Sequence, residues 1–291
     1  MQYEITLAVF MGINIIFAQS LNMITGFCGQ ISLGHAAFYG TGAYCSALMA
    51  KAGVPIPVCI LAAMAAAGLF GLIVGFASLR VRHDFLAITT MGVGFLFIGI
   101  VRQQDFLGGE MGVFGIPGIV DDKFQFMVVV LVLAALVIAL AVYLKHSWLG
   151  FAFDAIAQDE DTARTVGIGV ARYKLTAFVI GTALAGLAGA LYAHHVKFIG
   201  IDSFGFVESV TVLSMVIVGG IGSIWGVTIT AAVLSVLPLW LQFVSDYKLL
   251  LYGLLLFVVM RFSPDGLDGL LRWILRRLIG GIGRRVMADK A

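Results

Sequence analysis

The chain has 291 residues, of which 61% are hydrophobic and 12% are charged, and its formal net charge is +2 at pH 7. Soluble globular proteins are about 45–50% apolar and about 25% charged, so this composition excludes a soluble domain, a disordered chain and a nucleic-acid-binding protein. Three cysteines without CxxC spacing exclude a disulfide-stapled fold. We therefore expect an all-α integral membrane protein, whose partners include the lipid bilayer and no nucleic acid.

Apolar runs of about the 20 residues that a bilayer-spanning helix needs follow one another along the chain. They cover residues 5–25, 31–50, 55–79, 85–101, 124–144, 175–193, 207–244 and 249–260. Glycines interrupt the run 207–244, so we divide it into two segments. This pattern predicts a polytopic helical bundle of about 8–9 transmembrane helices with glycine-rich broken or re-entrant segments, the run 31–50 being the re-entrant candidate.

Lysine and arginine are concentrated in alternate loops, which sets the expected orientation. Most of the 18 basic residues lie in the loop that contains Arg80 and Arg82, in the loop 145–174 and in the tail from Arg261 onward. Because cytoplasmic loops carry an excess of these residues, we expect a multi-pass protein of the cell (inner) membrane with its C-terminus in the cytoplasm and its N-terminus outside. Residues 1–262 then form the transmembrane domain, including the cytoplasmic loop, and residues 263–291 form a basic amphipathic tail on the lipid surface.

The sequence offers no machinery for chemistry or for ion coupling. It has no GxxxxGK[ST] phosphate loop, no HExxH and no GxSxG, so we expect no enzyme, no metal site and no bound cofactor. We place Glu208 and Asp246 at the ends of apolar runs or in turns, which leaves the spans without a carboxylate. Ion-driven transporters often keep a carboxylate at membrane depth, so a stand-alone secondary transporter or channel is the disfavoured alternative.

The loop 145–174 is long, with 30 residues, and carries eight charges, four of each sign. Asp159 is a suitable N-cap for a short helix, because Glu160 and Asp161 in the first turn favour the positive end of the helix dipole. Gly167 supplies a stop at the other end of this helix. We therefore predict a structured and solvent-accessible segment rather than an irregular loop.

An apolar stripe precedes this short helix, because Phe151, Ala155 and Ile156 recur at helical spacing. These residues leave two interpretations open. In the first, the stripe lies on the bilayer surface beside a solvated loop. In the second, it belongs to a short helix that docks into a groove on a soluble partner.

Two glycine-rich segments lie inside the apolar runs, at residues 26–44 and 218–226. Glycine frees the backbone and small hydroxyls bond exposed carbonyls, so a broken helix in each half of the chain indicates a transport pathway. The candidate pathway residues are Ser32, Gly34, His35, Gly222 and Ser223. Close packing of helices is the alternative interpretation. His35 is then either a functional ionisable group or a neutral histidine held by Ser32 or by a carbonyl.

The loop resembles the cytoplasmic coupling loop of ABC-importer permeases of the branched-chain amino acid type, the LivH/LivM family. The residues that carry this resemblance are Gly150, Ala155, Ile156, Asp159, Glu160, Asp161, Ala163, Gly167, Ile168, Arg172, Tyr173 and Lys174. Phe151 and Asp154 depart from the family pattern, which usually has arginine at these places. The departure alters the charge pattern of the expected contact.

Three further segments are similar to motifs of the same family and occur in the same order. They are GFCGQISLGHAAFYGTGAY at 26–44, GGEMGVFGIP at 108–117, which resembles the outer loop of the LivM type, and VGGIGSIWG at 218–226. On the span that follows residues 85–88 the family commonly places Glu and Arg, whereas this chain has Phe95 and Ile98. This second departure bears on the identity of the cargo.

The resemblance implies a permease subunit that forms the translocation pathway for branched-chain amino acids and works by alternating access. Urea, short amides and aromatic carboxylates are alternative cargoes for the same type of permease. Residues 150–167 would dock on two cytoplasmic ATPase subunits, which bind ATP and Mg in place of this chain. A second permease subunit, either related or a second copy, and an external (periplasmic) substrate-binding protein would complete the importer.

Overall fold

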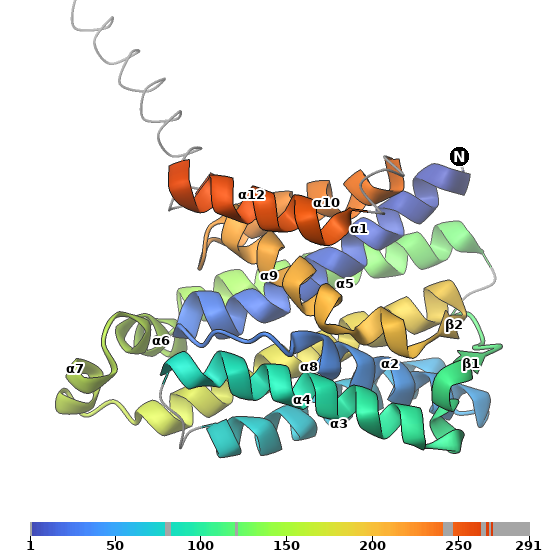
Figure 1. Cartoon of the computed structure of the whole chain (residues 1–291), viewed down its shortest axis with the longest axis horizontal. Coiled ribbons are helices and arrows are strands. Elements are labelled where there is room, and N and C mark those ends of the chain that lie inside the picture. Colours follow the sequence, from blue (N-terminus) through green and yellow to red (C-terminus); the bar gives the residue numbers. More distant parts are fainter. Residues whose placement is uncertain are drawn as a thin grey trace, which may run out of the picture.

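The computed structural model describes residues 2–78, 83–119, 122–240, 247–262, 266, 267 and 269. Arg80, Arg82, Asp246 and nearly all of the predicted tail 263–291 lie outside these residues. Within the described part, helices make up most of the chain and only two short strands occur (Figure 1). The predicted all-α class is therefore confirmed.

Short connections join the helices, which lie side by side along a common direction (Figure 1). The longer helices are α1 (Gln2–Leu21), α2 (His35–Lys51), α3 (Ile56–Ser78), α4 (His83–Gln103), α5 (Lys123–Lys145), α8 (Val170–Val196), α9 (Phe206–Gly219), α10 (Ile224–Trp240) and α12 (Lys248–Phe262). The shorter ones are the π-turn η1 (Asn22–Phe27), η2 (Asp105–Leu107), η3 (Gly109–Met111), α6 (Trp148–Gln158), α7 (Glu160–Thr165) and η4 (Ile201–Phe204). The strands are β1 (Val113–Phe114) and β2 (Phe198–Ile199).

Six helical segments of the described chain are long and apolar enough to cross a membrane. They are Gln2–Phe27, Ile56–Ala77, Phe85–Gln103, Lys123–Lys145, Val170–Val196 and Ile201–Gly219. The chain is thus a multi-pass membrane protein. The expected total of about 8–9 crossings stays a prediction, because α2, α10 and α12 are shorter than these six.

Helix α2 is largely buried and packs mainly against α3 and α8, while Phe17 of α1 stacks on its Tyr39. Its 17 residues rise about 25 Å at 1.5 Å per residue, short of the ~30 Å hydrocarbon core. A Cβ added at Gly42 would collide with the backbone of Gly186, and one added at Gly189 would collide with the carbonyl of Tyr39. The small residues therefore let α2 and α8 approach backbone to backbone, which is how helices pack where lipid replaces water.

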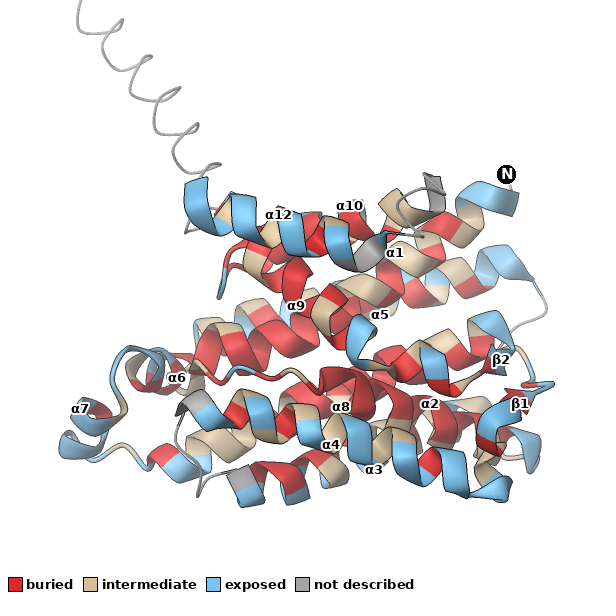
Figure 2. Ribbon diagram, in the orientation of Figure 1, coloured by how far each residue is buried: buried red, intermediate tan, exposed pale blue. Residues whose placement is uncertain are grey.

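The outer helices contrast with this centre (Figure 2). The apolar windows of α1 and α8 are each 67% buried, whereas that of α4 is only 17% buried and that of α5 28%. Large apolar side chains such as Phe95, Leu96 and Leu136 are exposed on these outer helices. The faces of α4 and α5 are therefore suited to contact lipid or another apolar membrane surface.

The two ends of the bundle differ in structure (Figure 1). Helices α6 and α7 project at one end, and α12 runs toward that same end. At the opposite end β1 pairs antiparallel with β2, with Val113 opposite Ile199 and Phe114 opposite Phe198. The first residues of α1 also lie at this opposite end. The glycine-rich outer segment 108–117 thus lies far from the loop 145–174.

Candidate functional site

The segment between α5 and α8 is a pair of short helices, as the sequence predicted. The Oδ1 atom of Asp159 accepts hydrogen bonds from the backbone N–H groups of Asp161 at 2.9 Å and Thr162 at 3.0 Å. This confirms Asp159 as the N-cap of α7. The bond from Thr162, with help from that of Asp161, lowers the pKa of the Asp159 carboxyl.

The end of α7 is fixed equally well by local bonds. Gly167 has a φ of +86°, which favours glycine, and its N–H donates to the carbonyl of Arg164 at 3.1 Å. The N–H of Ile168 donates to the carbonyl of Ala163, also at 3.1 Å. These two bonds form a Schellman motif and confirm the predicted stop at Gly167.

One ion pair attaches α7 to the second turn of α8, and two more lie within α7. Glu160 forms an ion pair with Lys174 of α8 and contacts Arg164 at 3.4 Å. Asp161 pairs with Arg164 at 2.9 Å and remains exposed. The three acidic residues of this turn therefore differ in role. Asp159 caps α7, Glu160 anchors it to α8, and Asp161 forms an exposed ion pair with Arg164.

The predicted apolar stripe of α6 is divided between two faces. Ile156 is buried and packs into the core, Ala155 is half-buried, and Phe151 is 63% exposed. Gly150 is also buried. It packs so closely against the end of α5 that a Cβ would collide with the carbonyls of Leu144 and Lys145. The three residues thus do not form one exposed stripe, since the turn from Phe151 to Ile156 rotates them to different sides of the helix.

A groove of about 540 Å³ lies beside the exposed face of α6. Phe151 and Trp148 of α6 line one side of it, and Val166 and Tyr173 line the other. Trp148 is 79% exposed and Val166 is 70% exposed. The sequence analysis missed both residues, because the groove arises only when the turn after α7 folds back beside α6.

The first group of candidate pathway residues is buried at the start of α2. The Nε2 atom of His35 lies 2.8 Å from Oγ of Ser20, and the ring stacks on Phe17 with centroids 5.3 Å apart. The predicted partner Ser32 is therefore wrong: Oγ of Ser32 is buried and has no hydrogen-bond partner among the described residues. Gly34 packs so closely on α4 that a Cβ would overlap the carbonyl of Thr90.

The second group lies in the break between α9 and α10. Gly222 has a φ of +78°, its N–H donates to Oδ1 of Asn22 at 3.0 Å, and its carbonyl accepts a hydrogen bond from Nζ of Lys145. The carbonyl of Ser223 accepts from Nδ2 of Asn22 at 3.3 Å, and its Oγ accepts from the N–H of Gly226 at 3.1 Å. The break is thus held by polar side chains from α5 and η1.

The two glycine-rich segments meet at Gly26 and Gly222, of which only Gly222 was among the candidate pathway residues. Gly26, rather than Gly34 or His35, lies against Gly222, where a Cβ would be 2.6 Å from its backbone nitrogen. The first segment also reaches the loop, because Nε2 of Gln30 donates to the carbonyl of Lys174 at 3.0 Å. Asn22 and Lys145 each lie near the end of an apolar run. A polar side chain in that position could have indicated that these residues contact other backbone groups, here those of the break between α9 and α10.

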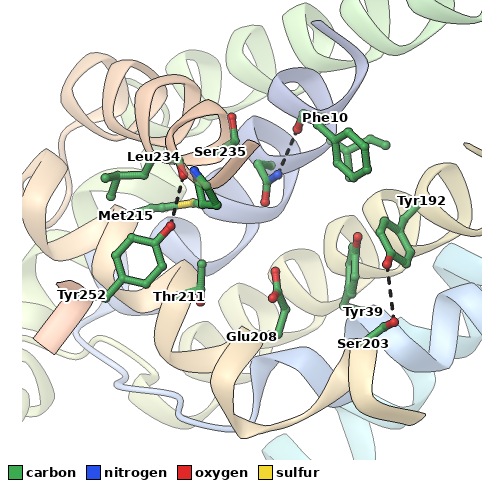
Figure 3. Close-up of a pocket in the computed structure, with 13 residues that line it drawn as sticks. Phe10, Tyr39, Tyr192, Ser203, Glu208, Thr211, Met215, Leu234, Ser235 and Tyr252 are labelled. Atoms are coloured by element: carbon green, nitrogen blue, oxygen red, sulfur yellow. Dashed lines mark hydrogen bonds between the residues drawn. The ribbon is translucent and has the colours of Figure 1, made fainter. Parts of the chain in front are cut away.

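A second cavity lies within the bundle, and it corrects the expectation that the spans lack a carboxylate. Glu208 is the third residue of α9, lies within the candidate span Ile201–Gly219 and lines a pocket of about 220 Å³ (Figure 3). The apolar run had been taken to begin at Val207, whereas the helical segment begins at Ile201. The carboxylates of the spans therefore do not exclude an ion-coupled transporter.

The described residues contain no group of three or more His, Cys, Asp or Glu side chains that could hold a metal ion. His194 instead bonds Oγ of Ser46 at 2.8 Å and the carbonyl of Pro117 at 2.7 Å. The ring of His195 stacks on Phe126 with centroids 5.5 Å apart. These two histidines therefore have structural roles at the β1–β2 end of the bundle.

Known proteins of similar sequence identify the family of this chain. Residues 4–260 match the family described as branched-chain amino acid transport system / permease component. The chain is 31% identical to the high-affinity branched-chain amino acid transport system permease protein LivM of Salmonella typhimurium, over 91% of this chain and 69% of that protein. It is 32% identical to LivM of Escherichia coli, over 88% and 67%, and 28% identical to BraD of Pseudomonas aeruginosa, over 87% and 91%. No solved structure matches the chain significantly. The chain therefore belongs to the branched-chain amino acid transport permeases and is a membrane permease subunit.

Proposed function

We propose that this permease is one subunit of an ATP-driven importer that carries branched-chain amino acids through the cell (inner) membrane by alternating access. The names of its relatives support the cargo. The observation that carries the coupling mechanism is the exposed groove beside α6, which lies at one end of the bundle, between α6 and the turn that leads into α8.

This groove has the features of a docking surface for a soluble partner. Trp148, Phe151 and Val166 expose apolar side chains that the protein does not cover, and apolar surface of this kind marks interaction sites. The cap at Asp159 and the ion pair between Glu160 and Lys174 fix the two short helices relative to α8. A rigid, apolar and accessible surface of this kind receives a partner and transmits its motion.

The proposed importer contains three kinds of partner. Two cytoplasmic ATPase subunits, which hold ATP and Mg, dock at residues 150–167 of the two permease subunits. A second permease subunit, either LivH-type or another copy of this chain, packs against the exposed membrane faces. An external substrate-binding protein delivers cargo at the β1–β2 end, and the C-terminus lies in the cytoplasm.

Contacts inside the protein give the docking loop a route to the membrane segments. Gly29 packs against Ala157 of α6, where a Cβ would lie 3.2 Å from its Cα atom. Lys145, three residues before α6, bonds the carbonyl of Gly222 in the break between α9 and α10. A displacement of α6 is therefore passed to both glycine-rich segments through packed contacts.

Reconstitution tests the proposal. The permease is assembled in liposomes with its ATPases, its second permease subunit and its binding protein, and uptake of labelled leucine is measured with and without ATP. Phe151→Asp places a charge in the groove and should lower ATPase co-purification and uptake at least tenfold. Ala171→Asp adds the same charge to an exposed position of α8 outside the groove and outside residues 150–167, and its uptake should stay within twofold of wild type.

Two outcomes contradict the proposal. Leucine uptake that persists without the ATPases indicates a stand-alone transporter, and equal loss in both variants indicates that the groove is not the docking surface. Urea, a short amide and an aromatic carboxylate serve as alternative labelled cargoes. ATP-dependent uptake of one of these without uptake of leucine replaces the cargo but keeps the mechanism.

A further inference from the structure

The pocket of about 220 Å³ inside the bundle has the position of a site on a transport route. Asn14, on its α1 side, is twelve residues from the start of the helix, or about 18 Å along it. Tyr192 lines it from the end of α8 that leads to β2. The pocket therefore extends from the middle of α1 toward the end of α8 that leads to β2. Figure 3 shows the side chains that line it.

One charged side chain lines this pocket. Glu208 is half-buried, whereas Glu4 and Asp202, the other carboxylates in the described candidate spans, are exposed. Among the described residues that line the pocket there is no lysine, arginine or histidine. A carboxylate in surroundings of low dielectric interacts strongly with a cation, and its two oxygens accept several hydrogen bonds beyond any made within the protein.

Hydroxyl groups surround this carboxylate. Tyr39, Tyr192 and Tyr252 are close enough to Glu208 to interact with it electrostatically. Figure 3 shows Glu208 and the ring of Tyr39 side by side in the cavity. The hydroxyl of Tyr192 also reaches Oγ of Ser203 at 3.4 Å. Hydroxyl oxygens accept hydrogen bonds, so this part of the pocket suits a group with several N–H donors, such as a primary ammonium.

The remaining wall of the pocket is apolar. Phe10 and Ile13 of α1, Met215 of α9 and Leu234 of α10 contribute to it. Small-molecule pockets for drug-sized ligands have volumes of about 300–1,000 Å³, so 220 Å³ limits the occupant to a smaller molecule. A branched aliphatic side chain with an ammonium group at one end matches both the polar and the apolar parts.

We propose that Glu208 binds the α-ammonium group of a branched-chain amino acid in this pocket during transport, with the aliphatic side chain against the apolar wall. This inference rests on the proposed function and assigns the residue that recognises the cargo within the permease. The tyrosine hydroxyls orient the ammonium group, and the cargo carboxylate faces away from Glu208 because like charges repel.

Uptake by the assembled importer provides the first test. Glu208→Gln keeps the size of the side chain but removes its charge, and it should lower leucine uptake at limiting leucine at least tenfold. Asp202→Asn is the matched control, because it removes an exposed carboxylate six residues earlier, and it should remain within twofold of wild type. If wild type takes up leucine and Glu208→Gln takes it up equally well, Glu208 is not the binding residue, and the proposed function still stands. No leucine uptake by wild type overturns both.

A labelling experiment retains Glu208 and therefore tests the site even where the variant fails to assemble. Ser203→Cys places a thiol at the pocket, and its reaction with a methanethiosulfonate carrying an ethylammonium group is followed over the background of the native cysteines. Leucine and 3-methylbutylamine, which carry the ammonium group, should slow the reaction at least threefold, whereas 4-methylpentanoate, which lacks it, should not. Any other order of protection contradicts recognition of the ammonium group.

Discussion

Removing the amino group of Lys145 should uncouple ATP hydrolysis from transport. Lys145 is the last residue of α5, and its Nζ donates to the carbonyl of Gly222 in the break between α9 and α10. The same Nζ lies 5.5 Å from the centroid of the Phe27 ring. Lys145→Met retains most of the aliphatic stem but has no donor, so it separates the hydrogen bond from packing.

The size of the effect follows from these two contacts. A hydrogen bond to a charged donor contributes about 1.5–3 kcal/mol, and a cation–π contact at a partly exposed site about 0.5–1 kcal/mol. Lys145 is only half-buried, so we expect a total of about 1.5–3 kcal/mol. Because 1.4 kcal/mol corresponds to a factor of ten, the state that holds this contact loses about 10–150-fold in population relative to states without it.

The assay measures leucine uptake and ATP hydrolysis in the same proteoliposomes. Lys145→Met should lower uptake at least tenfold and raise the ATP consumed per leucine, while Lys145→Arg retains a charged donor and should recover part of the coupling. Lys51→Met is the control, because Lys51 is exposed at the end of α2. An unchanged ratio of ATP to leucine in Lys145→Met refutes a role for this bond in coupling.

Three further predictions follow from the packing and the caps. Gly189→Ala should destabilise the detergent-solubilised protein by about 1–3 kcal/mol, because a Cβ collides with the carbonyl of Tyr39. Gly99→Ala in α4 is the control, because a Cβ there meets open space, and thermal unfolding should show no such loss for it. The pKa of Asp159 is lowered in the folded protein, so its cap is fully present above the unfolded pKa and is lost as the pH falls through the folded pKa. Amide exchange in α7 should increase in that acid window and lose this dependence in Asp159→Asn, which caps without titrating. His35→Ala removes the contact of His35 with Oγ of Ser20, which keeps only its bond to the carbonyl of Phe17, and opens a cavity, so it should cost about 2–4 kcal/mol in unfolding experiments. His35→Gln should retain most of the uptake, and loss of uptake in this variant contradicts a purely structural role.

The local features of the fold could be predicted from the sequence. Asp159 and Gly167 were correctly placed at the two ends of α7, because a helix cap depends on residues within one turn of the chain. Apolar length likewise gave the long helices, since a span needs about 20 apolar residues. The exposed loop was found because its charges cannot be buried in lipid without partners.

The contacts between distant segments could not be predicted. The bond from Lys145 to Gly222 joins residues 77 apart, and the amide of Gln30 reaches the carbonyl of Lys174 over 144 residues. No periodicity encodes such pairs, because each depends on the packing of several helices. The error at Glu208 has a different source. This residue was taken to mark the end of the apolar run 207–244, whereas the helical segment begins six residues before that run, at Ile201.

Helices α9 and α10 connect the loop 145–174, which is the proposed docking surface, with the pocket that Glu208 lines. Their break at Gly222 is held from the docking-loop end by Lys145, and Glu208 lies eleven residues before Gly219, about 16 Å along α9. A helix is stiff over this distance, so a displacement at the break cannot be absorbed before it reaches the pocket. Under the proposed coupling, movement of α6 therefore either changes the shape of the pocket or breaks the contact of Lys145, and the proposed alternating access requires the first of these.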